Sequence, residues 1–338
     1  MMQRPFVRRI VALLLIIGGA AAALHLLLLD WQRRLLARLD AQSFVIETAR
    51  GPVEYSDVGV GPVVLHLHGG VVAHDGWFYL DYLVEAGYRV ITPSRPGYLR
   101  TPLADHGSPQ FQADVMASFI DALKLEKVIV VGMSAGGLAA LQFALRYPDR
   151  TESLVLKSAI TRQTGLSEAQ QTSALGRIVL APWAQTYVYA LLYWAGRLFP
   201  RQVLNQFYLT ETTLDPAQRD TLVSQVLGSA QQRKSYAALL NAMVPIAARL
   251  RGLETDMHNQ YTSPDYELDA ITAPTLIIHS RHDGDSPFAN AEFAAELIPN
   301  AEFVPVDQFG HLINWGDEAG VSAWQTRAIA FMRQHNTA

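Results

Sequence analysis

The chain begins with an apolar segment that is long enough to cross a membrane. Residues 10–29 run for twenty positions without a charged side chain, after a group of arginines that begins at Arg4. A helix of this length, at about 1.5 Å per residue, matches the roughly 30 Å hydrocarbon core of a bilayer. A cleaved signal peptide is the alternative, with residues 20–23 as the cleavage region. Because the apolar block 24–29 continues beyond that region and signal peptides have shorter apolar cores, we predict an uncleaved single-pass anchor within residues 1–36.

The arginines around this segment leave its orientation nearly balanced. Three precede it and three follow it, so the excess of positive charge that marks the cytoplasmic side is almost absent. A short N-terminal tail stays in the cytoplasm easily. We therefore expect the rest of the chain on the exported side, periplasmic or extracellular, tethered to the membrane.

From residue 44 onward, short apolar runs alternate with amphipathic stretches. The apolar runs are typical of buried strands, and the stretches between them have the spacing of helices. We expect strands at residues 44–48, 53–57, 63–67, 89–92, 128–131, 153–157, 275–279 and 301–306, and helices at 77–86, 110–123, 138–146 and 289–298. The first two strands are joined through Gly51-Pro52 as an antiparallel pair. The alternation that follows predicts a mostly parallel, doubly wound sheet of the α/β class.

The alternation stops between residues 159 and 265. This region contains helical stretches interrupted by prolines, namely Pro182, Pro200, Pro216 and Pro245. We therefore predict a helical insertion over 159–265, between two parts of the core at 37–158 and 266–338. Inside it, the uncharged and aromatic-rich stretch 178–196 has three open interpretations: the core of the insertion, the wall of an apolar pocket, or a segment that enters the surface of a bilayer.

A serine lies in the turn between one predicted strand and the next helix. Gly132-Met133-Ser134-Ala135-Gly136 directly follows the strand 128–131 and precedes the helix 138–146. In this GxSxG pattern a tight turn pushes the serine hydroxyl out at the end of the sheet, and the residues two positions away on either side must be very small. Gly132 and Gly136 meet that requirement, which makes Ser134 a candidate nucleophile.

Three further groups follow predicted strands and complete a candidate site. His68-Gly69-Gly70 comes after the third strand, where glycines let backbone N–H groups turn inward beside that of Ala135. Asp283 and His311 come after the last two strands. Because the carboxyl ends of parallel strands meet at one edge of a sheet, we expect these groups to lie close to Ser134.

The order Ser–Asp–His, with a His-Gly-Gly after an early strand, resembles the α/β-hydrolase family. The resemblance covers about residues 44–160 and 265–335. It implies an α/β-hydrolase fold with an inserted helical cap over the active site. The residues that match the family's catalytic positions are Ser134 as nucleophile, Asp283 as acid, His311 as base, and Gly70 and Ala135 as the oxyanion hole.

Some of these assignments leave alternatives. Asp285 is the alternative acid, although it also precedes Ser286-Pro287 and suits a helix cap. His68 is expected to brace the oxyanion loop instead of reacting. The family often has an aspartate-led, glycine-rich loop where this chain has Ser94-Arg95, and we expect this departure to alter the rim of the site.

Metal and nucleic-acid binding are not expected. Histidines gather at His66, His68 and His74 and again within residues 279–283, but a metal site requires a denser ligand set, and Arg281 opposes a cation. We expect no metal and no cofactor. The net charge of −4 gives no reason for a nucleic-acid partner, and a chain without cysteine forms no disulfide or thiol site.

These features predict a membrane-tethered serine hydrolase that acts on a small-molecule carboxylic ester with an apolar acyl group. Amidase, aminopeptidase and carbon–carbon bond hydrolase activities stay open, because the same catalytic groups serve them. An aminopeptidase requires acidic cap residues to hold an amine, and the candidates are Glu211, Asp215, Glu254 and Asp256. The alternative outside enzymes is a ligand sensor or a membrane scaffold of this fold. The oligomeric state does not follow from these patterns.

Overall fold

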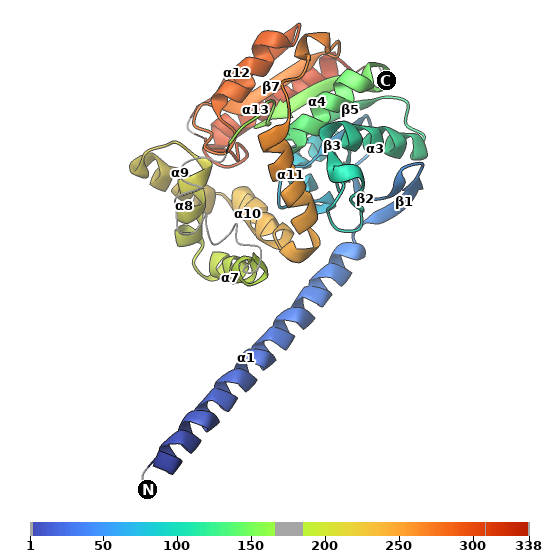
Figure 1. Ribbon diagram of the computed structural model, residues 1–338. Coiled ribbons are helices and arrows are strands. Elements are labelled where there is room, and N and C mark those ends of the chain that lie inside the picture. The colour runs from blue at the N-terminus through green and yellow to red at the C-terminus, as the bar shows by residue number, and fades with distance from the viewer. Residues whose placement is uncertain (1–2, 166–184, 308, 337–338) are drawn as a thin grey trace. The chain divides into compact units, whose positions relative to one another are not determined.

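The computed structural model (Figure 1) describes residues 3–165, 185–307 and 309–336. The chain divides into two units, Met1–Gln42 and Ser43–Ala338. Each unit has its own internal structure and is described by itself.

A single helix, α1 (Gln3–Asp40), makes up the first unit. It continues without a break past residue 36, and the unit extends to Gln42. Its most apolar window has a mean hydropathy of 2.5, and none of that window is buried. Among the described residues, α1 is the one helix with the length and composition of a membrane span, a test that an N-terminal signal sequence also passes.

The second unit is built around a sheet of eight strands. Their bounds are β1 (Phe44–Thr48), β2 (Gly51–Val58), β3 (Val63–Leu67), β4 (Arg89–Pro93), β5 (Val128–Met133), β6 (Thr151–Lys157), β7 (Thr275–Ser280) and β8 (Ala301–Val306). The spatial order is β1-β2-β4-β3-β5-β6-β7-β8. In this spatial order, all neighbouring strands from β4 through β3 to β8 pair in parallel. By contrast, β1 pairs antiparallel with β2, and β2 pairs antiparallel with β4. All eight predicted strands and the mostly parallel sheet are confirmed.

Helices cover both faces of this sheet, because successive strand residues point to opposite faces. Neighbouring residues of the central strand β5, such as Val130 and Val131, therefore belong to two separate hydrophobic cores. The helices of the first core are α3 (Pro109–Ala122), α4 (Gly136–Arg146) and α12 (Phe288–Leu297), and those of the second are α2 (Asp81–Glu85) and α13 (Glu318–Gln334). Because both faces are covered, functional groups are confined to the strand ends and the loops.

Two helices differ from the sequence-based expectation. The predicted helix 77–86 is a 3-10 segment, η1 (His74–Leu80), followed by the short α2. The C-terminal α13 has no counterpart among the predicted elements, although its buried residues have helical spacing. These residues are Val321, Trp324, Ala328 and Phe331.

Helices also fill the described part of the predicted insertion. They are α7 (Gln185–Leu198), α8 (Pro200–Glu211), α9 (Pro216–Gly228), α10 (Ala230–Ala242) and α11 (Leu250–Thr262). The short 3-10 turn η4 (Ile246–Ala248) also lies in this region, whereas η2 (Asp105–Gly107), η3 (Pro148–Arg150) and η5 (Leu268–Ala270) lie outside it. Pro200 and Pro216 are the first residues of their helices, a position that favours proline. They therefore begin helices instead of interrupting them. Residues 178–184 of the uncharged stretch, with Pro182, lie outside the described residues.

Lys157, at the end of β6, is a buried cation. Its Nζ donates hydrogen bonds to the backbone oxygen of Tyr79 (3.1 Å) and to Oδ1 of Asn314 (2.7 Å), and it lies 5.3 Å from the ring centre of Trp324. Burial disfavours the ammonium ion and lowers the pKa of Lys157 to about 7. The side chain thus joins β6 to the segment that contains Asn314, at an electrostatic cost while it is charged.

Because of Lys157, we expect stability to rise with pH over part of the alkaline range. Its pKa of about 7 in the folded chain lies below the unfolded value of about 10.4, so the unfolded chain binds more protons between these values. A difference of one proton changes the free energy of unfolding by about 1.4 kcal/mol per pH unit. Lys157→Met should reduce the slope of the free energy of unfolding against pH, and the exposed Lys234→Met should not. The measurement is a denaturant titration of the detergent-solubilised chain at several pH values. Equal slopes in both variants would contradict this account.

Candidate active site

Ser134 lies in a strained turn between β5 and α4. Its backbone φ is +50°, in the left-handed region that costs a residue with a side chain about 1–3 kcal/mol. Hydrogen bonds of the backbone hold the turn: its N–H donates to the oxygen of Lys157 (3.3 Å), and its oxygen accepts from the N–H groups of Gly137 (2.9 Å) and Ile160 (3.0 Å). The strain is therefore supported from both sides of the turn.

The two flanking glycines are required by packing. A Cβ atom at Gly132 would lie 2.5 Å from Cβ of Ala140, and a Cβ at Gly136 would lie 2.1 Å from the backbone oxygen of Leu67. The first turn of α4 thus approaches β3 and β5 more closely than any side chain permits. The two glycines of the GxSxG pattern are therefore required by this close approach.

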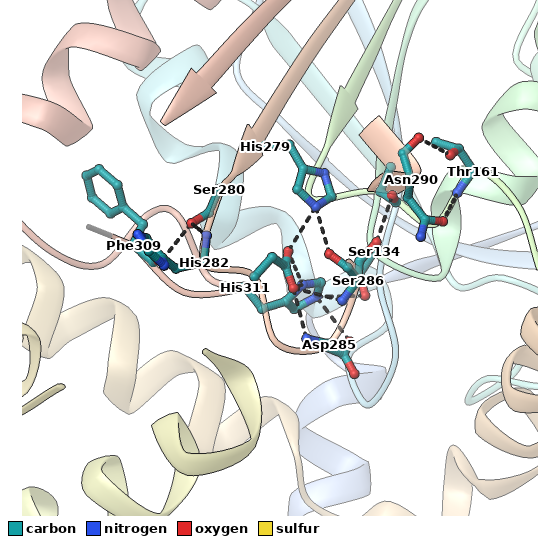
Figure 2. Close-up of polar contacts among 12 residues, drawn as sticks. Ser134, Thr161, His279, Ser280, His282, Asp285, Ser286, Asn290, Phe309 and His311 are labelled. Carbon is teal, nitrogen blue, oxygen red and sulfur yellow. Dashed lines mark hydrogen bonds and ion pairs between the residues drawn. The ribbon is translucent and has the colours of Figure 1, made fainter. Parts of the chain in front are cut away.

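The structure brings the three predicted catalytic residues together at the carboxyl ends of the strands. Nε2 of His311 lies 2.9 Å from Oγ of Ser134, and Nδ1 of His311 lies 2.8 Å from Oδ2 of Asp283. Figure 2 shows the imidazole of His311 beside Ser134. All three side chains are buried, although Ser134 and His311 are 177 positions apart in the sequence.

The carboxylate of Asp283 is fixed by its own loop. Oδ1 accepts hydrogen bonds from the backbone N–H groups of Asp285 (2.9 Å) and Ser286 (2.7 Å), and Oδ2 lies 3.3 Å from Nε2 of His279. Asp285, the alternative acid, lies on the other side of His311, with its Oδ2 3.4 Å from Nε2. Asp283 is thus the carboxylate that contacts Nδ1, and Asp285 faces the nitrogen that contacts Ser134.

Charges around His311 favour its protonated form. Burial disfavours charge on both His311 and Asp283, but their attraction outweighs it. Asp283 and then Asp285 raise the pKa of His311, and His311 lowers the pKa of Asp283. A base of this kind requires a higher pH, or the loss of a neighbouring charge, before it can accept a proton.

Glu211, at the end of α8, adds a third carboxylate near the imidazole. Burial and then the charge of Asp285 raise the pKa of Glu211 to about 8. Glu211, Asp285 and His311 offer possible metal-ligand atoms within 4.8 Å of one another. A cation held there would compete for the Nε2 that faces Ser134, and the expectation of a metal-free site stays a prediction.

Comparison with known proteins places the chain in a family. It matches the family described as alpha/beta hydrolase fold over residues 62–318, which is most of its length. The chain belongs to the α/β-hydrolase family. The predicted fold class is confirmed by this match and by the strand order.

Hydrolases of two kinds are similar to this family member. It is 32% identical over 272 residues to the uncharacterized hydrolase YcgS of Bacillus subtilis (strain 168), covering 80% of this chain and 91% of that protein. It is 28% identical to a 2-hydroxy-6-oxononadienedioate/2-hydroxy-6-oxononatrienedioate hydrolase of Paraburkholderia phymatum, covering 78% and 85%. Among solved structures, an alpha/beta hydrolase fold protein from Nakamurella multipartita aligns with a TM-score of 0.74 and 28% identity, over 87% of this chain and all of that one.

In this α/β-hydrolase, Arg95 supports residues 68–70, the predicted oxyanion loop. Its Nε donates to the backbone oxygen of His68 (2.8 Å), and its backbone N–H donates to Nε2 of the same histidine (3.0 Å). The ring of His68 in turn donates from Nδ1 to the oxygen of Gly69 (2.7 Å), as expected of a bracing residue. The expectation that Arg95 alters the rim is wrong, because the side chain is only 1% exposed.

A buried ion pair connects this loop to the cap. The guanidinium of Arg95 binds both carboxylate oxygens of Asp256 on α11 (2.6 and 2.5 Å), and the hydroxyl of Tyr98 donates to the same carboxylate. Asp256 is therefore occupied by an arginine. Of the four acidic candidates for binding an amine, Asp215 caps α9 and Glu254 is exposed, so only Glu211 faces the pocket with its charge uncommitted to an arginine.

A second cap segment, residues 211–213, holds the loops that carry the acid and the base. Thr212 forms an isolated β-bridge with Asp283. The backbone oxygen of Glu211 accepts from the N–H groups of Gly284 (3.2 Å) and His311 (2.8 Å). The sequence gives no signal for this contact, because backbone groups of any residue type can make it.

The pocket that reaches Ser134 has a volume of about 460 Å³. Gly70 and Ala135, the predicted oxyanion-hole residues, line it beside Ser134. Most other lining residues are apolar, including Leu192, Val203, Phe207, Leu240, Met257 and Leu312. Among the lining residues that the structure describes there is no lysine or arginine, whereas Glu211, Asp256 and Asp285 contribute carboxyl groups.

We expect Asp285→Asn to lower the pKa of His311. Removal of an opposite charge 3.4 Å from Nε2 weakens the imidazolium, and shifts of about 1 pH unit are typical of such contacts. The measurement is the titration midpoint of the His311 ring resonances by NMR. Asp149→Asn, at the opposite edge of the sheet, is the control, and an unchanged midpoint in Asp285→Asn would refute the assignment of this carboxylate.

We expect Asp256→Asn to destabilise the protein by about 3–5 kcal/mol, because it leaves the buried charge of Arg95 unpaired. The matched control is Asp220→Asn, which removes an exposed pair with Arg201 and should cost about 1 kcal/mol or less. Both are measured by chemical denaturation of the detergent-solubilised chain. Equal and small losses would show that the pair does not support the contact between cap and oxyanion loop.

Proposed function

We propose that this protein is a membrane-anchored serine hydrolase that cleaves a carboxylic ester with an apolar acyl group. The observation that carries the proposal is the hydrogen-bonded series from Ser134 through His311 to Asp283 at the wall of an apolar pocket. A serine is a poor nucleophile by itself, and a neighbouring imidazole oriented by a carboxylate activates it.

In the proposed mechanism, Oγ of Ser134 attacks the ester carbonyl while Nε2 of His311 accepts its proton. Asp283 holds the imidazole by Nδ1 and stabilises the imidazolium. The N–H groups of Gly70 and Ala135 bind the negative oxygen of the tetrahedral intermediate, and each such donor contributes about 3–4 kcal/mol to lowering the barrier. His311 then protonates the leaving alcohol. Water, activated by the same histidine, hydrolyses the acyl-enzyme.

The charges of the pocket support an uncharged acyl group. A carboxylate taken into a mostly apolar pocket requires a cation or several hydrogen-bond donors. The described lining offers neither lysine nor arginine, its glutamines and tyrosines supply only neutral donors, and Asp285 would repel an anion. Glu211 is mostly uncharged at neutral pH, because its pKa is about 8. A dioate, as named for the Paraburkholderia relative, therefore suits this pocket less well than a neutral ester. Carbon–carbon bond hydrolysis stays the second candidate on the same catalytic groups.

An amine-bearing amide or ester is a further candidate, favoured by Glu211. Its carboxyl group faces the pocket close to His311. A substrate ammonium group bound there would favour the ionised form of this carboxyl group and pair with it. Glu211→Gln should then weaken turnover of an aminoacyl substrate more than turnover of a neutral ester of equal size.

The proposed anchor is α1, with the catalytic unit on the exported side of the membrane. Support for the anchor comes from the length and hydropathy of this helix. Because the chain has no cysteine, a single cysteine introduced at the exposed Ser224 reports the side by its reaction with an impermeant maleimide on intact cells.

The test of the proposed function is a series of chromogenic esters of increasing acyl length, with the full chain in detergent. We expect turnover with an optimum at medium or longer acyl groups, because the pocket is apolar. Ser134→Ala should lose at least about 10³-fold in kcat, and Ser153→Ala, a buried serine inside β6, should retain activity. A folded wild-type protein that hydrolyses none of the series would overturn the esterase proposal and favour the carbon–carbon hydrolase or sensor alternatives.

A further inference from the structure

One helix of the cap has an apolar side that faces solvent. Tyr187, Leu191, Trp194 and Leu198 recur on α7 at intervals of four, three and four residues, which places them on one side of the helix. They are 51%, 69%, 52% and 68% exposed. We call these four residues the α7 outer face. In Figure 1, α7 lies on the side of the cap away from α12 and β7.

The opposite side of the same helix faces the substrate pocket. Gln185, Tyr189 and Leu192 line that pocket, and Gln185 and Tyr189 are buried. A soluble surface helix normally combines one apolar side with one polar side. In contrast, α7 is apolar on both sides, so this one helix separates the pocket from whatever contacts the outer face.

Two arginines lie close to the outer face in the sequence. From residue 185 to 210 the charged residues are Arg197 and Arg201. Arg201 is paired with Asp220 of α9 (2.7 Å), which leaves Arg197 as the cation beside the face. The neighbouring α9 differs, because its exposed side chains include Gln218, Asp220 and Ser224. Exposed tryptophan, tyrosine and leucine beside arginine are typical of segments that lie in the interface of a bilayer.

We propose that the α7 outer face binds the surface of a lipid bilayer. The four side chains enter the boundary between headgroups and acyl chains, and Arg197 lies at the level of the anionic headgroups. The inference builds on the anchor under the proposed function: α1 ends at Asp40 and the first strand begins at Phe44, so the catalytic unit of an anchored chain stays close to the bilayer. The substrate class is then an apolar ester that resides in the membrane and reaches the pocket beside α7.

The absence of cysteine allows a direct test on the full chain. Single cysteines at Leu191→Cys and Leu198→Cys receive a nitroxide label, and the protein is reconstituted in vesicles of phosphatidylcholine alone or mixed with phosphatidylglycerol. Accessibility to oxygen, which concentrates in lipid, is compared with accessibility to an aqueous nickel chelate. We expect both labels to report lipid, and a label at the exposed Asp149→Cys, which precedes β6, to report water.

Labels at both α7 positions that report water would overturn the inference. Spin–spin broadening between copies at Leu191→Cys, without oxygen accessibility, would also overturn it and indicate a second copy of the chain as the occupant. A label at Leu14→Cys tests the anchor separately. If the label at position 14 reports lipid and the label at 191 reports water, the α7 inference is rejected and the anchor is kept. If the label at position 14 reports water, the anchor is rejected, and the labels on α7 still decide the α7 inference.

A kinetic comparison gives an independent reading. The double variant Leu191→Ser/Leu198→Ser changes neither a lining residue nor a proposed catalytic group. We expect its KM for a vesicle-borne ester to rise about tenfold, because the loss of buried apolar surface weakens contact with lipid. The kinetics on a short, water-soluble ester should stay unchanged. An equal change on both substrates would show a general effect on the fold and contradict the inference.

Discussion

The close approach of α4 to the ends of β3 and β5 is the constraint on which the site depends. Because Gly132 and Gly136 have no room for a side chain, the turn between β5 and α4 must be tight, and Ser134 must project from the edge of the sheet. The backbone of that turn is hydrogen-bonded to Lys157 and Ile160, so the next strand is fixed to it. The loops after β7 and β8 reach the same edge, which lets His311 contact Ser134.

The cap is part of the site's geometry as well as its cover. One cap segment binds the backbone of the loops that carry Asp283 and His311. Another cap element, α11, supplies the carboxylate that pairs with Arg95 beneath the oxyanion loop. A change in the cap therefore alters the positions of the proposed catalytic groups, since the same hydrogen bonds hold both.

The charges of the site and the apolar surfaces around it favour one kind of substrate. The carboxyl groups of Asp283, Asp285 and Glu211 lie near His311, and the pocket beyond them is mostly apolar. This environment disfavours anions and retains a proton on the imidazole, which supports the uncharged acyl group that we propose. The apolar outer face of α7 supports the membrane-resident ester of the further proposal.

The sequence by itself determined the eight strands, the strained turn at Ser134 and the order of the candidate catalytic residues. Strand periodicity and the glycines of a tight turn are local requirements, so they are visible in any stretch of the chain. Only the tertiary structure decided that Asp283 contacts Nδ1 while Asp285 faces Nε2, and that Arg95 is buried against Asp256. The distinction depends on which loops meet across 28 and 161 positions of sequence. Such contacts are set by how the cap packs on the sheet, and no local pattern records that packing.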